Sequence, residues 1–448
     1  MWQKGASCLG GSDINFDLVV KNGRVFTSTG QMSTEVWIKD GRIAALGGAH
    51  RAEERIDARG MLVLPGAIDV HVHFRDPGPN YKEDWASGSA SAAAGGVTAV
   101  VDQPNTVPRT MDARSFEEKL EIARHRSCVD FALNAGPGKI DELKEAGAQA
   151  IGEIFSYEHS DAELAAILSQ VGRAGMLASL HAEDGAIIKE KLAEFSGRHD
   201  PEVYSLARPA KAEAAAIEKA CGISERLHIC HLSSAQGLAA VEAGRRAGRT
   251  VSAEVAPHHL LLNEKDYPKQ GSFLKMNPPL RRKADNDALW QALRSGKIDI
   301  LASDHAPHLP EEKREDIWEA PPGVPGVETM LPLMLMAVKK NLISLERLVD
   351  ALSAQPARIF GLAGKGRIER GMDADLVIVD SKAVTEINAG RLHSRAEWTP
   401  YQGKQAIFPK MTIVRGRVVW DGDLQAIPGY GRFLGRPITR EKQKVLSE

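Results

Sequence analysis

The sequence has few cysteines and no long apolar segment. Its four cysteines, Cys8, Cys128, Cys221 and Cys230, are spaced neither as a disulfide framework nor as a thiolate zinc site. We therefore expect four reduced thiols, which is typical of a cytoplasmic protein. No stretch approaches the roughly 20 apolar residues of a membrane helix. Residues 1–17 lack the apolar core of a secretory signal, so we expect neither a membrane protein nor a secreted one.

A surplus of basic residues is also missing. The 57 Lys and Arg residues face 59 Asp and Glu residues, which gives a formal net charge of −2. Nothing in this balance indicates a nucleic acid or a membrane surface as partner. Hydrophobic residues make up 43% of the 448 residues, enough for a large core. We expect a globular protein whose partner is a small-molecule substrate.

Both ends of the chain are rich in β-branched residues and tight turns. Asn22-Gly23 and Asp40-Gly41 each separate two short apolar runs. These dipeptides predict hairpins, because type I′ turns need a positive φ at both central residues. Similar runs return at residues 375–380 and 412–420. We therefore predict one small β-sandwich domain built from both chain ends, residues 1–64 and 366–448.

The middle of the chain, residues 65–365, alternates short apolar runs with helical patterns. The eight apolar runs are 63–70, 97–102, 129–134, 150–155, 176–180, 227–229, 251–255 and 298–302. Helical patterns span 112–126, 161–172, 212–220 and 287–294, and Ser160 with Glu163 forms a capping box. This alternation indicates an α/β fold with a parallel sheet, and eight repeats in about 240 residues fit a (β/α)₈ TIM-like barrel. A doubly wound sheet would carry a glycine-rich phosphate turn where His71-Val72-His73 stands.

Polar side chains follow the ends of the predicted strands. Because the carboxyl ends of barrel strands meet at one mouth, five of these side chains should converge there. They are His71, His73, His181, His231 and Asp304. One histidine at a strand end is more often structural, but imidazoles together with a carboxylate are the ligands that zinc prefers. We therefore predict a metal centre, and we expect His228, inside its strand, to be a core or supporting residue.

Asp304 is the predicted catalytic residue. A bound metal ion lowers the pKa of water and polarises a carbonyl group. Asp304 would accept a proton from that water and pass it to the leaving nitrogen, as general base and then general acid. The alternative is a buried aspartate that only accepts hydrogen bonds from backbone amides.

These motifs resemble the amidohydrolase superfamily, and within it the cyclic amidohydrolases: dihydroorotase, allantoinase and hydantoinase. The resemblance runs from the segment 65–71, Pro-Gly-Ala-Ile-Asp-Val-His, to the segment 366–376. The pattern is most similar to dihydroorotases of the longer bacterial and archaeal type. The segments that favour this type are Arg75 after the histidine pair, Gln103–Thr106, Asn277–Arg281 and Asp304–His308.

The resemblance implies a role for each motif residue. His71, His73 and Asp304 would bind one metal ion, and His181 and His231 a second. Substrate contacts would come from Arg75, Asn105 and His308 at a carboxylate, and from Asn277 at the pyrimidine ring. The planar fork of an arginine suits a carboxylate. The alternatives are a solvated ion pair of Arg75 with Asp76 and a turn role for Asn277 before two prolines.

One position departs from the family pattern. Many relatives carry a carboxylated lysine at the end of the fourth strand, where it bridges two metal ions, but Glu153 stands here. No lysine occurs between Lys144 and Lys189 to replace it. Either Glu153 is a metal ligand, or it reaches no metal and one ion binds firmly. We favour a ligand, because a charge at a barrel mouth needs a partner; pairing with a basic or hydroxyl side chain is the alternative. We expect one or two Zn²⁺, or another divalent ion, per chain.

The expected activity is that of a dihydroorotase. It interconverts N-carbamoyl-L-aspartate and dihydroorotate in de novo pyrimidine biosynthesis, and we expect a cytoplasmic homo-oligomer. Allantoinase or hydantoinase/dihydropyrimidinase activity is the nearest alternative. A non-catalytic scaffold is less compatible with the retained ligands, and a metal-storage or sugar-binding barrel leaves Arg75, Asn105 and His308 unexplained. The segment 309–329, charged and then rich in Pro and Gly, predicts either a mobile lid or a plain surface connection.

Overall fold

The computed structural model describes residues 3–4 and 15–435, and within these residues eight parallel strands form a barrel. The strands follow the chain order, and the bridges Ala135–Ile151 and Val72–His305 join the two strand groups into a closed ring. They are β9 (Ala67–Val72), β10 (Val97–Asp102), β11 (Asp130–Leu133), β12 (Ile151–Phe155), β13 (Ala178–His181), β14 (Arg226–Ile229), β15 (Thr250–Val255) and β16 (Ile300–Leu301). The carboxyl ends of these strands all lie at the same end of the barrel, which we call its mouth.

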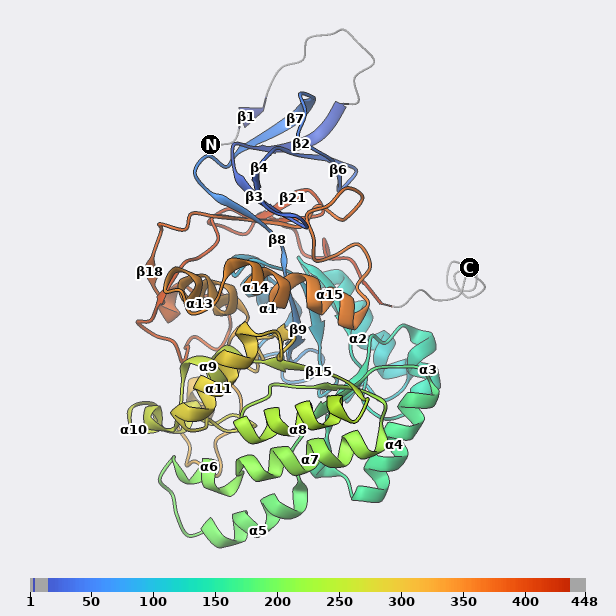
Figure 1. Cartoon of the computed structure of the whole chain (residues 1–448), viewed down its shortest axis with the longest axis vertical. Helices are drawn as coiled ribbons and strands as arrows, with labels where there is room; N and C mark the ends of the chain where they lie inside the picture. Colours follow the sequence, from blue (N-terminus) through green and yellow to red (C-terminus); the bar gives the residue numbers. More distant parts are fainter. Residues whose placement is uncertain (1–2, 5–14, 436–448) are drawn as a thin grey trace.

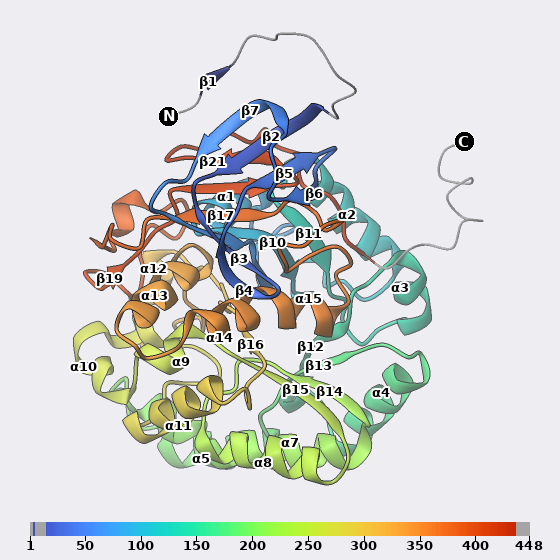
Figure 2. The same cartoon turned by 45° about the horizontal axis from the view of Figure 1, so that its top comes forward.

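Helices surround the barrel strands, as Figure 2 shows. The longer ones are α1 (Trp85–Ala94), α2 (Ala113–Arg126), α3 (Ile140–Ala146), α4 (Asp161–Arg173), α5 (Gly185–Phe195), α7 (Ala210–Ile223), α8 (Ala235–Arg246), α11 (Lys283–Arg294) and α13 (Val327–Lys339). The shorter ones are α6 (Val203–Ala207), α9 (Pro257–Leu261), α10 (Tyr267–Gln270), α12 (Pro310–Lys313), α14 (Leu345–Val349), α15 (Gln355–Phe360), η1 (Ser156–Glu158), η2 (Glu264–Asp266), η3 (Gly271–Leu274), η4 (Asp350–Ala354) and η5 (Ala389–Arg391). The predicted capping box is present at the start of α4, where Ser160 and Glu163 satisfy each other's backbone amides.

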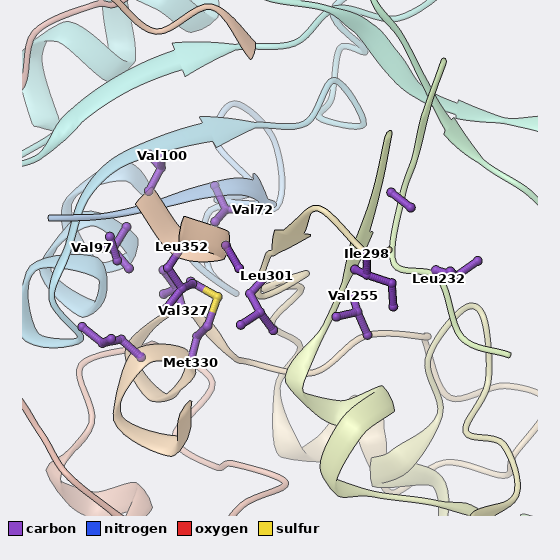
Figure 3. Close-up of a cluster of buried hydrophobic side chains, with 14 of the residues drawn as sticks. Val72, Val97, Val100, Leu232, Val255, Ile298, Leu301, Val327, Met330 and Leu352 are labelled. Atoms are coloured by element: carbon purple, nitrogen blue, oxygen red, sulfur yellow. The ribbon is translucent and has the colours of Figure 1, made fainter. Parts of the chain in front are cut away.

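The main core lies between the barrel strands and the helices. Helix α13 is buried along most of its length, because nearly all of its side chains are apolar. Figure 3 shows Val327 and Met330 of this helix beside Val97, Leu301 and Leu352. This layer holds the strands in place and leaves their polar ends free to form the mouth.

Two antiparallel-rich sheets pack together beside the barrel, at the top of Figure 1. The first contains β1 (Gln3–Lys4), β2 (Asn15–Lys21), β5 (Val36–Lys39), β6 (Arg42–Leu46) and β7 (Arg51–Asp57); the second contains β3 (Arg24–Thr27), β4 (Gly30–Ser33), β8 (Leu62–Pro65), β17 (Leu376–Val379), β20 (Met411–Val414) and β21 (Arg417–Trp420). A small pair, β18 (Thr385–Glu386) and β19 (Gln405–Ala406), lies apart. Val20 and Ile38 of the first sheet share a core with Val63, Leu376 and Ile413 of the second. The predicted barrel with a β-sandwich from both chain ends is confirmed, whereas the boundaries 1–64, 65–365 and 366–448 stay a prediction.

Two details of the predicted strands were wrong. The run 63–70 is not one barrel strand: it divides into β8 of the sandwich and β9 of the barrel at Gly66. A Cβ at Gly66 would lie 2.1 Å from Thr98 Oγ1, so a glycine is needed where the chain changes sheet. The hairpin at Asp40-Gly41 is correct, with φ of 51° and 73°. The one at Asn22-Gly23 is not, because β2 and β3 belong to different sheets and Gly23 packs closely on Val63.

A buried charged cluster connects the barrel with the sandwich. Lys365 Nζ lies 2.5 Å from Asp130 of β11, 2.6 Å from Asp375 and 3.1 Å from Asp373. We call these four residues the junction cluster. The carboxylates keep the pKa of Lys365 above its ordinary value although burial opposes the charge. The ammonium group therefore joins the segment 365–375 to Asp130 of β11, which lies 235 residues before Lys365 in the sequence.

The structure can be compared with what the sequence predicts about cysteines and membrane helices. Cys128, Cys221 and Cys230 are buried free thiols, and Cys8 lies outside the described residues. Over residues 3–4 and 15–435, the structure has no helix with the length and apolar character needed to cross a membrane.

Candidate active site

A cavity of about 520 Å³ opens at the carboxyl ends of the barrel strands. Its lining comes from loops that follow several strands and includes most of the residues singled out in the sequence. Those in the lining are His73, Arg75, Asn105, Glu153, His181, Asn277, Asp304 and His308. His71 and His231 are fully buried beneath these lining residues, and their rings contact each other. The structure thus brings all the sequence-predicted site residues together.

The carboxylate of Glu153 lies among four imidazoles. Its Oε1 is 2.8 Å from His231 Nε2 and 3.0 Å from His181 Nδ1. Its Oε2 faces the other pair, at 3.6 Å from His71 Nε2 and 3.8 Å from His73 Nε2. Burial alone would favour the neutral acid, but the imidazoles reverse this and keep the pKa of Glu153 well below its usual range. One ionised carboxylate therefore reaches both histidine pairs.

Asp304 completes the group on the side of the first pair. Its Oδ1 lies 3.3 Å from His73 Nε2 and 3.5 Å from His71 Nε2. Burial opposes ionisation, but His73 and His71 lower the pKa of Asp304 below its ordinary value. The ligand atoms of His71, His73 and Asp304 all lie within 4.8 Å of one another, as do those of His71, Glu153 and His231.

Outer partners determine which nitrogen of each ring faces the centre. His71 donates its Nδ1 proton to Glu254 over 2.5 Å, and His73 donates its Nδ1 proton to the amide oxygen of Asn105 over 2.7 Å. His181 is turned the other way, because its Nε2 donates to Glu183 over 2.7 Å. Each of these rings therefore directs its other nitrogen at the centre, and in its neutral form it would offer a lone pair to a metal ion there.

This donor set fits a divalent metal ion. Neutral imidazole nitrogens and ionised carboxylates are the ligands that such ions take from proteins. The Nε2 atom of His71 is buried and has no hydrogen-bond partner in the described part of the chain. A buried nitrogen without a partner costs free energy, and a metal ion would satisfy it. The site can thus bind metal through residues on several strands.

The backbone is strained at three of these positions. Arg75, His231 and Asp304 have φ angles of 61°, 31° and 48°. Residues other than glycine rarely adopt this left-handed backbone conformation. Such strain is concentrated at functional sites. These residues follow the ends of β9, β14 and β16, and Arg75 and Asp304 line the cavity.

Arg75 and His308 lie next to each other in the cavity lining. Lys82 Nζ lies 3.1 Å from His308 Nδ1, so Nδ1 accepts and Nε2 carries the proton that it donates to Pro322 O over 3.0 Å. Burial, with Arg75 and Lys82 nearby, lowers the pKa of His308 well below its usual range. The Arg75 guanidinium lies 3.2 Å from His308 Nε2. Since the His308 proton is donated to Pro322 O, the Arg75 guanidinium is the donor that an anionic acceptor would meet here.

Arg75 has no ionic partner of its own within the residues that the structure describes. The predicted alternative, a pair with Asp76, is not formed, because Asp76 contacts Arg126 at 3.3 Å. The Nε atom of Arg75 is buried without a hydrogen bond. Asn277 also faces the cavity and does not act only as a turn residue, since Tyr204 donates to its Oδ1 over 2.7 Å.

The supporting carboxylates were missed by sequence reasoning. Glu183 could have been found, because it lies two residues after His181 just as His73 follows His71. Glu254 is a lone acid inside a buried strand, which is a weaker signal. His228, expected to be a core or supporting residue, donates to Glu254 over 3.0 Å. Arg208, which pairs with Glu183, has no sequence signal.

Comparisons with known proteins agree with this arrangement. The family model described as "Amidohydrolase family" matches residues 62–419. A dihydroorotase from Methanosarcina mazei is 44% identical, with 93% of this chain and 97% of the relative covered. An allantoinase from Rubrobacter xylanophilus is 37% identical over 95% of this chain and 99% of the relative. An L-hydantoinase (dihydropyrimidinase) from Arthrobacter aurescens superposes with a TM-score of 0.89 at 33% identity, covering 94% of this chain and all of that one. The chain therefore belongs to the amidohydrolase family.

Proposed function

We propose that this protein is a dihydroorotase, a hydrolase that opens dihydroorotate to N-carbamoyl-L-aspartate and closes it again in pyrimidine synthesis. One observation carries the proposal: the Arg75 guanidinium lies without an ionic partner in the same cavity as the imidazole and carboxylate group. Dihydroorotate has a cyclic amide for the metal centre and a carboxylate for the arginine. The relatives named dihydroorotase at 39–44% identity support the same activity.

The residues that would hold the metal are the four histidines, Asp304 and Glu153. Zinc is the ion that we propose, because imidazoles and carboxylates suit it. Once bound, the metal would activate water and polarise the amide carbonyl. Glu153 would serve as a shared ligand, because each of its oxygens faces one histidine pair. We therefore expect two ions per chain.

Side chains of the protein would transfer the proton and bind the substrate. Water adds to the carbonyl carbon, and Asp304 accepts the water proton through its carboxylate. When the carbon–nitrogen bond breaks, Asp304 returns that proton to the departing nitrogen. Arg75 would hold the substrate carboxylate, with His308 and Asn105 beside it. Asn277, whose Oδ1 is occupied by Tyr204, would offer its amide N–H to the ring.

A matched pair of substrates tests the proposal. Dihydroorotate and dihydrouracil differ only in the carboxylate that Arg75 would hold. We expect the metal-replete full chain to prefer dihydroorotate, and Arg75→Met to lower kcat/KM for it by about 100-fold while leaving dihydrouracil nearly unchanged. The control is Arg109→Met, because Arg109 lines the same cavity but pairs with Glu158. Better turnover of allantoin or hydantoin than of dihydroorotate would contradict the proposal.

A metal count tests the role of Glu153. Purified protein should hold two ions, and Glu153→Ala should lose at least one, whereas Glu158→Ala at the cavity rim should lose none. One tightly bound ion that survives Glu153→Ala would exclude a shared ligand. Gel filtration and cell fractionation would test the proposed homo-oligomer and its cytoplasmic location.

A further inference from the structure

The segment between Ala306 and Val324 leaves the barrel and returns to it at one point. Ala306 N donates to Val324 O over 2.9 Å, and His305 Nδ1 accepts from Gly326 N over 3.1 Å. The segment therefore forms a closed loop, which we call the roof loop (306–324). It carries α12, and it contributes His308, Pro322 and Gly323 to the cavity lining.

Lys313 lies at the centre of the roof loop with no exposed surface. Its ammonium group donates to three backbone carbonyls: Lys275 O at 2.9 Å, Pro321 O at 2.9 Å and Gly323 O at 3.0 Å. No carboxylate within the described residues forms an ion pair with it. Because an ammonium has three N–H donors, each proton has one acceptor. All three hydrogen bonds of Lys313 thus go to the backbone, and the Trp398 ring lies 5.8 Å from its Nζ.

The three carbonyls belong to two walls of the cavity. Lys275 lies two residues before Asn277, and its carbonyl also accepts from Gly323 N over 2.9 Å. Pro321 and Gly323 flank Pro322, whose carbonyl accepts from His308 Nε2 over 3.0 Å. One ammonium group therefore joins the wall that bears Asn277 to the wall that holds His308.

The wall around Gly323 has little freedom to adjust. Gly323 has a φ of 137°, which favours glycine, and a Cβ there would lie 2.5 Å from Ala306 O and 3.2 Å from His308 Cδ2. The backbone thus packs directly on the His308 ring. A shift of this backbone would move the imidazole with it.

We propose that Lys313 is a positioning residue for substrate binding, whose three donated hydrogen bonds set the spacing between Asn277 and His308. The proposal rests on the proposed function, because those two side chains are assigned to the ring and the carboxylate of dihydroorotate. Lys313 is not itself one of the residues that line the cavity, and within the described residues it forms no hydrogen bond or ion pair with the metal group. Its loss should weaken binding of the ground state and the transition state equally, which raises KM and spares kcat.

The test compares Lys313→Met with Lys144→Met in the full, metal-replete chain. Lys144 is the control, because its Nζ donates to a single carbonyl, Ala174 O, on an outer helix. In Lys313→Met we expect KM for dihydroorotate to rise about tenfold or more, with kcat within about threefold of the parent. The metal content should not change. Hydrogen exchange of the amides in 272–277 and 309–324 should become faster in Lys313→Met only.

Each outcome of the test either supports the proposal or overturns it. An unchanged KM in Lys313→Met would overturn it, as would equal changes in the control. If Lys313→Met does not fold, Lys313→Gln keeps an amide donor, and an unchanged KM there would overturn it as well. Absence of dihydroorotate turnover in the parent chain would refute the proposed function separately. The exchange measurement then still decides whether Lys313 anchors the two walls.

Discussion

Glu254 gives a sharp test of how the metal ligands are held. Its carboxylate accepts from His71 Nδ1 at 2.5 Å, from His228 Nε2 at 3.0 Å and from the backbone N of His231 at 3.1 Å. Burial opposes its ionisation, but His71 and His228 keep the pKa of Glu254 below its ordinary value. Glu254→Gln keeps the shape of the side chain and removes its charge and one acceptor oxygen.

The size of the effect follows from these contacts. In Glu254→Gln an amide N–H replaces one acceptor, so at least one of the three donors is left unpaired, at a cost of about 1–3 kcal/mol. If His71 loses its acceptor, its ring is less basic and freer to turn. Loss of such an outer partner lowers metal affinity by about 10- to 100-fold, which corresponds to about 1.4–2.8 kcal/mol.

The assay is competition for Zn²⁺ against a chromophoric chelator of known affinity. The matched control is Glu213→Gln, because Glu213 is as buried as Glu254 but accepts from Ser233 and Ser234 and from no imidazole. We expect the control to bind metal within about threefold of the parent. If Glu254→Gln binds Zn²⁺ as tightly as the parent does, the reasoning about imidazole orientation is refuted.

Three further predictions concern stability. Removing the metal with a chelator should lower the unfolding temperature and returning Zn²⁺ should restore it, since free metal at 100 times Kd contributes about 2.7 kcal/mol; an unchanged melting curve would contradict this. Lys365→Met should lower the free energy of unfolding in urea by about 3–5 kcal/mol, because the aspartates of the junction cluster lose the one cation that contacts all three of them, while Arg415 and Arg432 still pair with Asp130 and Asp373; a smaller loss than in Lys144→Met would argue against it. Burial, with Arg208 nearby, lowers the pKa of Lys275 to about 8 from its ordinary 10.5. Between about pH 8 and pH 10.5 the Lys275 amine is protonated in the unfolded chain and neutral in the folded chain. The free energy of unfolding should therefore rise with pH in this range. Lys275→Met removes this titration and should flatten the rise.

The barrel could be predicted because its signals are local. Each barrel strand except the first is an apolar run that begins and ends within a few residues of its prediction, and the capping box at Ser160 is complete in the sequence alone. The histidines could be grouped because parallel strands place their carboxyl ends together. That rule needs no knowledge of distances.

Other features depend on contacts that no local pattern contains. Asn22-Gly23 has the composition of a hairpin turn, but β3 pairs with β4 and β8 and not with β2, and Gly23 packs closely on Val63 of β8. Glu254 and Arg208 act through residues more than 20 positions away. The central place of Glu153 depends on the orientation of both histidine pairs. Sequence reasoning could therefore identify the ligands but not their supports.

The sandwich sheet that contains β8 also imposes an order on folding. Strand β8 pairs with β17, more than 300 residues later, through Leu64 and Val377. A chain emerging from the ribosome therefore exposes the apolar faces of its first strands until nearly all of it has been made. Such late, long-range pairing slows folding and leaves strands open to aggregation in the meantime. Expression at low temperature or with added chaperones is the practical consequence for anyone producing this protein.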